Sequence, residues 1–385
     1  MRVAIFTNAY KPAISGVVTS ISLFRQGLHA AGHQTHIFAP DYEDFGDDEP
    51  YVFRLPALDL SEQLNISIVL PLKSLVELTL RGIQPAIIHS QHPVWMGDLA
   101  ATCARELSIP LVFTFHTQYE QYAQSYSPIA GKLAGRFTEE RVRHYLQQCS
   151  HVIAPTESIR AMLDSKFGLT EQVTVVPTPV DLDRFRSARP GEVRARFGLE
   201  DREVLLYVGR IAREKGLDVL LRAFAEVHGR RPQTRLMLVG IGPYLEDAVH
   251  LRNELGLREV VTFTGAVPYA EIAPYYAAAD LFVFSSTTET QGLVLLEALA
   301  CGTPVVAVSA PGAADVLKDG GGHLTGASDG AFAQGILRVL EDEEEMSKLR
   351  REAPAVAECY SIDATTGRMI EVYEQTVRSR ARHHR

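Results

Sequence analysis

Short runs of branched and aromatic hydrophobic residues alternate along the chain with longer amphipathic stretches. Five runs in the first half predict buried strands: Val3–Phe6, His36–Ala39, Ala86–His89, Leu111–Phe115 and His151–Ala154. Helical patterns lie between them, at Val17–Ala31, Trp95–Leu107 and Ile129–Cys149. Strands that alternate with helices of this length are typical of βαβ units, in which helices cover both faces of a parallel sheet.

The alternation of strands and helices stops at Val175–Pro179, where two prolines frame a turn, and then begins again. Five further strands are predicted at Val204–Val208, Arg235–Val239, Val260–Phe263, Leu281–Phe284 and Pro304–Val308. An acidic helix at Glu341–Glu345 and a last helical stretch from Asp363 to Arg378 follow. The pattern therefore predicts an α/β protein of two doubly wound, Rossmann-like domains, residues 1–178 and 179–362.

Composition adds limits to this picture. A length of 385 residues fits two or three domains, and the repeat of the strand pattern narrows the number to two. The net charge of −9 argues against a nucleic-acid partner bound by broad phosphate neutralisation. The four cysteines form no C-x-x-C pair, and no apolar run is long enough for a signal peptide or a membrane span. We expect a cytoplasmic protein, and peripheral attachment to a membrane stays open.

Ligands of doubly wound domains bind beyond the carboxyl ends of the strands, so the loops there are the candidates for chemistry. In the first half, Gly16 stands where a loop enters a helix and lets an anionic ligand approach the backbone amides. His116 ends a strand and faces the same edge of the sheet. The alternatives are a simple turn glycine and a buried, hydrogen-bonded histidine.

Two cations flank a strand-to-helix loop in the second half. Arg210 follows the strand Val204–Val208, and Lys215 opens the next helix. Both side chains can reach one phosphate cluster, Arg210 as a bidentate donor and Lys215 as a point charge. The alternative is a pair of solvated surface cations.

The segment from Ser285 to Glu297 carries the most information. Glu289 lies in the loop after a strand, and Glu297 lies in the second turn of the following helix, with seven residues between them. The backbone amides of Gly292, Leu293 and Val294 lie at the helix N-terminus between the two carboxylates. This arrangement suits a ligand with hydroxyl groups at both ends and a diphosphate in the middle. A capping acid and an unrelated helix carboxylate are the alternative.

Three other patterns are weaker. Gly240-Ile241-Gly242 resembles the start of a dinucleotide fingerprint, but Leu245 stands where the third glycine belongs. Asp181-Leu182-Asp183 matches a metal-binding D-x-D signature, although its place after the prolines favours a turn cap. His89 and His92 lack a third metal ligand nearby.

With these loops in place, the chain resembles the family-4 retaining glycosyltransferases of the GT-B fold. The residues that carry the resemblance extend over nearly the whole chain: Ser15–Thr19, Val208–Arg210, Glu214–Gly216, Leu238–Pro243, Phe263–Pro268, the E-x7-E pair Glu289/Glu297, and Pro304–Ala307.

The resemblance implies that the second domain binds a nucleoside-diphosphate sugar, that the first binds the acceptor, and that the active site is a central cleft which the two domains face. It also implies that the helix 363–385 packs back on the first domain. It assigns Arg210 and Lys215 to the diphosphate, Glu289 to the donor sugar and Glu297 to the ribose. The segment Gly265–Val267, which ends in Val267, would lie beside the nucleotide base.

The resemblance gives two residues of the first domain a role as well. Gly16 would line the donor phosphates, and His116 would contact the transferred sugar. These two residues therefore complete the predicted donor site from the acceptor domain.

Two segments resemble family members that glycosylate diacylglycerol, Thr288–Gly292 and the aromatic-rich His116–Tyr122. They imply a UDP-sugar donor, with GDP second, and a glycerolipid acceptor at the membrane. Thr117-Gln118 departs from the Thr-Met common in that subgroup, which leaves the acceptor open.

The expected reaction is hexosyl transfer with retention and without a metal or another cofactor. No nucleophile is paired with an acid as a double displacement requires, so a same-face attack fits better. Open alternatives are a GDP-mannose or other nucleotide-sugar transferase with a soluble or polysaccharide acceptor, an epimerase on the same scaffold, an NAD-dependent oxidoreductase and a non-catalytic binding module.

The helical pattern Ile129–Cys149 is the candidate for contact with anionic lipid. Its basic residues alternate with hydrophobic ones; the basic set is Lys132, Arg136, Arg141, Arg143 and His144, and the hydrophobic set is Leu133, Phe137, Val142, Tyr145 and Leu146. A solvated helix face is the alternative, because Glu139 and Glu140 interrupt the positive charge. The oligomeric state stays open.

Overall fold

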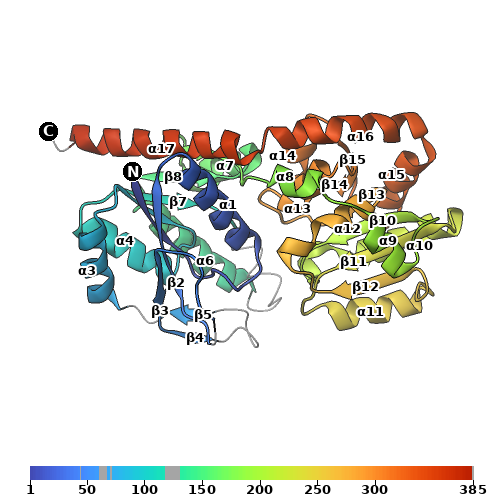
Figure 1. Ribbon diagram of the computed structural model, residues 1–385, viewed down its shortest axis with the longest axis horizontal. Helices are drawn as coiled ribbons and strands as arrows, with labels where there is room; N and C mark the ends of the chain where they lie inside the picture. Colours follow the sequence, from blue (N-terminus) through green and yellow to red (C-terminus); the bar gives the residue numbers. More distant parts are fainter. Residues whose placement is uncertain (44, 60–66, 70–71, 118–130, 384–385) are drawn as a thin grey trace. The chain divides into compact units, whose positions relative to one another are not determined.

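The chain divides into two compact units (Figure 1). The computed structural model describes all residues except 44, 60–66, 70–71, 118–130 and 384–385, and it does not describe the side chains of 58–59, 67–69, 131–137 and 381–383. Unit 1 comprises Met1–Pro179 and Ile362–Arg385, and unit 2 comprises Val180–Ser361. The boundaries expected at residues 179 and 363 lie within one residue of these limits.

Unit 1 is built on a seven-stranded parallel sheet in the order β3-β2-β1-β6-β7-β8-β9. Its strands are β1 (Arg2–Phe6), β2 (Gln34–Pro40), β3 (Val52–Leu55), β6 (Ile87–Ser90), β7 (Leu111–Thr114), β8 (His151–Ala154) and β9 (Val173–Val175). A small antiparallel pair, β4 (Ala57–Asp59) and β5 (Ser67–Val69), lies outside this sheet.

Helices cover both faces of the unit 1 sheet, as the two-residue period of its strands requires. Val3 and Ile5 of β1 belong to a core shared with α1 (Gly16–Ala30) and α17 (Ile362–His383), while Ala4 and Phe6 belong to the core on the other face. The helices of that second core are α3 (Lys73–Ile83), α4 (Met96–Glu106), α6 (Gly131–Leu146) and α7 (Glu157–Phe167). Helix α17 packs along α1, where Gly27 leaves room for Thr366 (Figure 1).

Unit 2 repeats the design with a six-stranded parallel sheet in the order β12-β11-β10-β13-β14-β15. Its strands are β10 (Glu203–Val208), β11 (Thr234–Val239), β12 (Val261–Gly265), β13 (Leu281–Phe284), β14 (Val305–Val308) and β15 (Gly322–Thr325). The fold is therefore GT-B, as the sequence predicted.

Short and long helices surround the unit 2 sheet. They are α8 (Leu182–Arg186), α9 (Gly191–Phe197), α10 (Leu217–Arg230), α11 (Leu245–Glu254), α12 (Ala273–Ala278), α13 (Leu293–Ala300), α14 (Ala313–Leu317), α15 (Asp329–Glu341) and α16 (Glu343–Glu358), with 3₁₀ turns η1 (Arg213–Lys215) and η2 (Tyr269–Glu271). Helix α10 packs beside α15, and α13 packs beside α16.

The ten predicted strands are confirmed, but the sequence pattern missed several elements. Strand β15 was not predicted because Gly322, His323 and Thr325 interrupt its apolar run. Strand β9 was not predicted; it ends at Val175, where the predicted hinge begins. The single acidic helix over Glu341–Glu345 was wrong: α15 ends at Glu341, and the Asp342 side chain caps α16 by accepting hydrogen bonds from the amides of Glu344 and Glu345.

Candidate active site

The functional loops of unit 2 meet where the strand order reverses. Strands β10 and β13 are neighbours, with β11 and β12 continuing on one side and β14 and β15 on the other. At such a switch point the loops that leave the two central strands diverge and leave room for a ligand. The Ser285 hydroxyl donates to the Lys215 carbonyl oxygen at 2.9 Å, so the loops after β10 and β13 are in contact. Gly216 permits this approach, because a Cβ there would lie 2.7 Å from the Ser285 carbonyl oxygen.

Lys215 and Glu289 form an ion pair across these two loops. Nζ of Lys215 lies 2.5 Å from Oε1 of Glu289, and the Ser286 hydroxyl donates to the same oxygen at 2.9 Å. Burial opposes ionisation of Glu289, but the charge of Lys215 and the hydrogen bonds from Lys215 and Ser286 outweigh it and lower its pKa. The pair therefore places a full positive and a full negative charge at the switch point.

Helix α13 begins just after the loop that carries Glu289. Gly292 precedes the helix in the left-handed region, with φ of 80°, and no side chain caps this end. The amides of Leu293 and Val294 thus open the first turn with the positive end of the helix dipole. The predicted residues Gly292, Leu293 and Val294 therefore lie at this helix N-terminus, shortly after Glu289 in the sequence.

Arg210 and Val267 flank the same edge of the sheet. Arg210 is partly exposed two residues after β10, and its carbonyl oxygen accepts a hydrogen bond from the Tyr207 hydroxyl at 3.0 Å. Val267 follows β12 by two residues and packs against the unit 2 core. Both positions therefore lie at carboxyl ends of strands, where the sequence put them.

Glu297 lies deeper than the other predicted residues. Its side chain on α13 is buried, and the Tyr276 hydroxyl donates to Oε2 at 2.5 Å. Burial raises the pKa of Glu297 to about 7, although Tyr276, Tyr269 and Arg184 favour the ionised form. The sequence showed Glu297 but not these three partners, because they lie on separate elements and carry no local motif.

Unit 1 has a matching switch point between β1 and β6. The amide of Asn8, after β1, donates to Nδ1 of His92, after β6, at 3.1 Å. Nε2 of His116, after β7, is hydrogen-bonded to Oε1 of Gln91 at 2.6 Å. Burial lowers the pKa of His116 to about 3, and the neighbouring His92 and His89 act in the same direction. His116 is thus a neutral ring at physiological pH.

Gly16 stands at the first position of α1, behind the capping residue Ser15, whose hydroxyl accepts from the amide of Val18 at 3.3 Å. A Cβ at Gly16 would meet nothing within 4 Å. The packing of unit 1 therefore does not itself require glycine at this position.

The weaker sequence patterns have structural explanations. A Cβ at Gly240 would lie 1.9 Å from the Gly209 carbonyl oxygen, and one at Gly242 would lie 2.3 Å from that of Ile211. Both glycines thus allow two backbone segments to pack. Asp181 caps α8 by accepting from the amide of Arg184 at 3.2 Å, which confirms the cap. Among the described residues, no group of three or more His, Cys, Asp or Glu side chains could hold a metal ion.

The expected lipid-binding helix corresponds to α6, and its hydrophobic positions are explained differently. Val142, Tyr145 and Leu146 are buried in the unit 1 core, so these three side chains are not available for contact with lipid. Arg141 is 2.5 Å from Asp98, and Arg143 pairs with Glu139 at 3.2 Å.

The rest of this prediction lies outside what the structure describes. The side chains of Lys132, Leu133, Arg136 and Phe137 are not described, and neither are residues 118–122 of the aromatic-rich segment. No described helix has both the length and the hydropathy that crossing a membrane requires.

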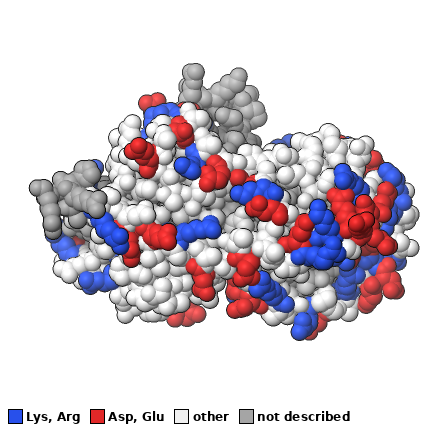
Figure 2. All heavy atoms as spheres, turned by 90° about the horizontal axis from the view of Figure 1, so that it is seen from above, with Lys and Arg blue, Asp and Glu red and all other residues white. Residues whose placement is uncertain are grey.

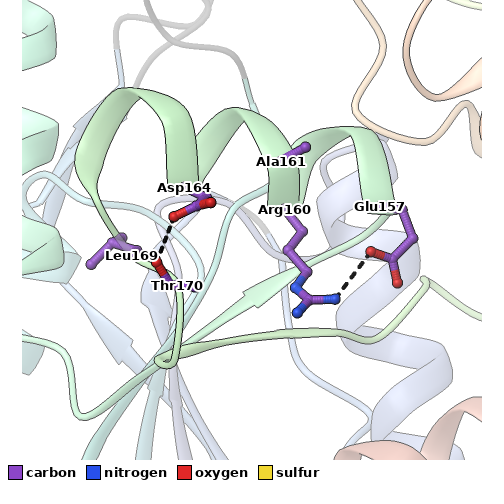
Figure 3. Close-up of a pocket in the computed structure, with 6 residues that line it drawn as sticks. All are labelled: Glu157, Arg160, Ala161, Asp164, Leu169 and Thr170. Atoms are coloured by element: carbon purple, nitrogen blue, oxygen red, sulfur yellow. Dashed lines mark hydrogen bonds and ion pairs between the residues drawn. The ribbon is translucent and has the colours of Figure 1, made fainter.

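Two surface features lie apart from these residues. Arg160 pairs with Glu157 at 3.3 Å and Thr170 donates to Asp164 at 2.6 Å in a depression beside α7 (Figure 3). Its charged side chains thus have partners within the depression, and no predicted site residue lines it. On the face drawn in Figure 2, the basic and acidic side chains of the described residues are interspersed.

Comparison with known proteins identifies the class of the chain as the glycosyltransferases. The chain belongs to glycosyltransferase family 4. Residues 14–184 match the model of Glycosyltransferase Family 4, and residues 191–356 match that of Glycosyl transferases group 1.

The relatives of the chain include lipid glycosyltransferases. It is 34% identical over 326 residues to alpha-monoglucosyldiacylglycerol synthase of Streptococcus pneumoniae, covering 83% of this chain and 74% of the relative. The enzyme of the same name from Acholeplasma laidlawii is 32% identical, with 80% of each chain covered. A GDP-mannose-dependent alpha-mannosyltransferase of Mycobacterium tuberculosis is 30% identical, covering 85% of this chain and 83% of the relative.

Solved structures share the fold. Anabaena HepE in complex with UDP and glucose superimposes with a TM-score of 0.79 at 21% identity, covering 97% of this chain and 100% of HepE.

Proposed function

We propose that the chain transfers a hexose from a UDP-sugar to a hydroxyl group of a membrane glycerolipid such as diacylglycerol, with retention at the anomeric carbon and without a metal ion. The observation that carries this proposal is the Lys215–Glu289 ion pair beside the N-terminus of α13. Two relatives are named as glucosyldiacylglycerol synthases, and HepE was solved with UDP and glucose, which supports this donor and acceptor.

Unit 2 supplies the donor site in this proposal. Lys215, Arg210 and the amides of Leu293 and Val294 stabilise the charge that develops on the departing diphosphate. Glu289 accepts hydrogen bonds from hydroxyls of the donor sugar, because its lowered pKa keeps it ionised. Glu297 accepts from the ribose hydroxyls, and Val267 borders the base.

Unit 1 supplies the acceptor side. Gly16 allows donor phosphates to approach the start of α1, and neutral His116 hydrogen-bonds the transferred sugar. The acceptor hydroxyl attacks from the face that the diphosphate leaves, and the leaving phosphate oxygen takes its proton. One C–O bond forms as the other breaks, so the step needs no other reactant.

A GDP-sugar donor is the second candidate, because a GDP-mannose-dependent relative covers most of the chain. Measuring which donor binds is enough to distinguish these candidate functions, and it requires no acceptor. A thermal-shift screen with UDP-glucose, UDP-galactose, GDP-mannose and NAD identifies which nucleotide raises the melting temperature, and we expect the UDP-sugars to do so.

The transfer itself is tested with vesicles that contain diacylglycerol, with and without EDTA. We expect a glycosylated lipid whose anomeric configuration, read by NMR, matches the donor, at equal rates with and without EDTA. Product that forms without any acceptor would indicate an epimerase instead. A rate that falls with EDTA and returns with a divalent cation would contradict metal independence.

A further inference from the structure

The Tyr276 hydroxyl is held rigidly against the Glu297 carboxyl group. It donates to Oε2 at 2.5 Å, and the Tyr276 side chain is fully buried on α12. Its ring packs between Phe185 and Phe282, with centroids 5.7 Å and 5.5 Å away. The Thr303 hydroxyl donates to the Tyr276 carbonyl oxygen at 2.8 Å. Backbone and ring are both fixed, so the hydroxyl has one position from which to act.

Charged and titratable groups of two further elements, η2 and α8, also act on Glu297. Tyr269 of η2 and Arg184 of α8 favour its ionised form, and the Arg184 guanidinium lies 4.8 Å from the centroid of the Tyr269 ring. Asp181, the capping residue of α8, lies 3.4 Å from Arg184. Cys301, one turn further along, has a pKa raised by burial and by Glu297, so its thiol stays neutral. Of the groups that favour the ionised form, Tyr276 lies at hydrogen-bond distance from Oε2 of Glu297.

We propose that Tyr276 is a positioning residue for nucleotide recognition: it occupies Oε2 of Glu297 and so fixes the carboxyl group with Oε1 as the acceptor for the ribose hydroxyls. This inference rests on the role of Glu297 in the proposed function. Tyr276 itself touches no substrate.

The pH dependence of donor binding distinguishes this role from simple packing. An ionised carboxylate accepts hydrogen bonds from vicinal hydroxyls, whereas the protonated group has lost one acceptor site. Because the Tyr276 hydroxyl favours the ionised form, removing it raises the pKa of Glu297. The pH below which the donor binds weakly therefore rises too.

The experiment measures the Kd of UDP-glucose by calorimetry between about pH 5.5 and pH 8.5, with the full chain and without acceptor. UDP-glucose is preferred to UDP because its diphosphate has no terminal group that titrates in this range. The variants are Tyr276→Phe, Glu297→Gln and both together, with Tyr275→Phe as the matched control on the same helix. Tyr275 is also buried, and its ring lies beside Phe197.

We expect the wild type to bind more weakly as the pH falls through about 7. Tyr276→Phe raises this midpoint by about one pH unit and weakens binding at pH 7 about fivefold. In Glu297→Gln the Kd of UDP-glucose should not depend on pH in this way. Adding Tyr276→Phe to this variant should change the Kd little further. Tyr275→Phe keeps the wild-type midpoint. Weaker binding with an unchanged midpoint in Tyr276→Phe would overturn the proposal.

A second variant covers the case in which Tyr276→Phe does not fold. Incorporating 3-fluorotyrosine at position 276 keeps the ring and makes the hydroxyl a stronger donor, so the midpoint should fall below that of the wild type. An unchanged or higher midpoint contradicts the inference. If the wild type binds a GDP-sugar and no UDP-sugar, the donor assignment fails alone, and the same profiles are measured with GDP-mannose.

Discussion

Nε2 of His116 and Oε1 of Gln91 are joined by a hydrogen bond of 2.6 Å. Because the ring of His116 is neutral, it carries one proton, and an amide oxygen as partner requires this proton on Nε2. The Gln91 side chain is buried, and its backbone amide donates to the Phe6 carbonyl oxygen at 2.9 Å, so β1 holds the residue that orients His116.

The first prediction follows from this pair. Replacing Gln91 by Leu removes the hydrogen bond that orients the ring of His116, and we expect kcat to fall about tenfold while the Kd of the UDP-sugar stays close to that of the wild type. Steady-state kinetics and calorimetry measure the two quantities. Gln26→Leu, on the exposed side of α1, serves as the control. An unchanged kcat in Gln91→Leu would show that the orientation of His116 does not matter for the reaction.

The second prediction concerns the ion pair of unit 2. Lys215→Ala removes the proposed diphosphate contact and the ion pair with Glu289, so both activity and stability should fall. We expect kcat/KM to drop at least about tenfold. Adding Glu289→Gln removes the buried charge that Lys215 balanced and should restore part of the melting temperature at pH 7 but none of the activity.

Exposed Lys318→Ala is the control for this pair. Activity of Lys215→Ala within about twofold of the wild type would contradict the assigned role. The direction in which stability changes with pH provides a further check. Since the pKa of Glu289 is lowered in the folded chain, the pair stabilises at neutral pH and this contribution disappears as the pH falls through that pKa.

The strand ends of both units could be predicted from the sequence because buried parallel strands consist of nearly continuous apolar runs. Lys215 and Glu289 were found because each follows such a run, but 74 residues separate them, and only the sheet order β10-β13 brings them together. Tyr276 is likewise 21 residues from Glu297 and sits in a short helix of no marked pattern. Contacts of this kind depend on topology, which no local spacing encodes.

Gln91 was visible in the sequence only as a neighbour of His89 and His92. The signal that could have revealed it is its place directly after β6, the strand between those that precede Gly16 and His116. Reading every polar residue at the carboxyl end of a strand as a site candidate would have included it.

The third prediction tests the structural explanation of the Gly240-x-Gly242 pattern. Gly240→Ala places a Cβ 1.9 Å from a backbone oxygen, at a φ of 141° that side chains disfavour. We expect a loss of more than about 4 kcal/mol in the unfolding free energy or failure to fold. Gly229→Ala, within α10 and with open space around its Cβ, should be neutral or stabilising by up to about 1 kcal/mol.

Chemical denaturation of both glycine variants, followed by circular dichroism, measures this difference. The comparison is matched because each variant adds one methyl group to unit 2. A Gly240→Ala variant as stable as the wild type would mean that these glycines are not needed for packing. Their role would then have to be sought in a ligand after all.

The fourth prediction is that Glu297 makes unit 2 less stable as the pH rises. Its pKa is about 7 in the folded chain, well above the ordinary value of a glutamate, so the folded state binds its proton more tightly than the unfolded state does. Stability therefore falls between the ordinary pKa and about pH 7, and at ~1.4 kcal/mol per pKa unit the total is about 3–4 kcal/mol. Glu297→Gln should be more stable than the wild type at about pH 8.5 and equal to it near pH 4.5.

Scanning calorimetry at the two pH values measures this effect, with exposed Glu259→Gln as a control that should show no such pH dependence. Equal melting temperatures of Glu297→Gln and wild type at high pH would show that Glu297 ionises without cost. The expected result has a functional meaning, because a buried carboxylate that lowers stability at neutral pH is retained only where its charge has a use. Glu297→Gln should accordingly gain stability and lose affinity for the UDP-sugar in the same pH range, which links the cost of the charge to the ligand it recognises.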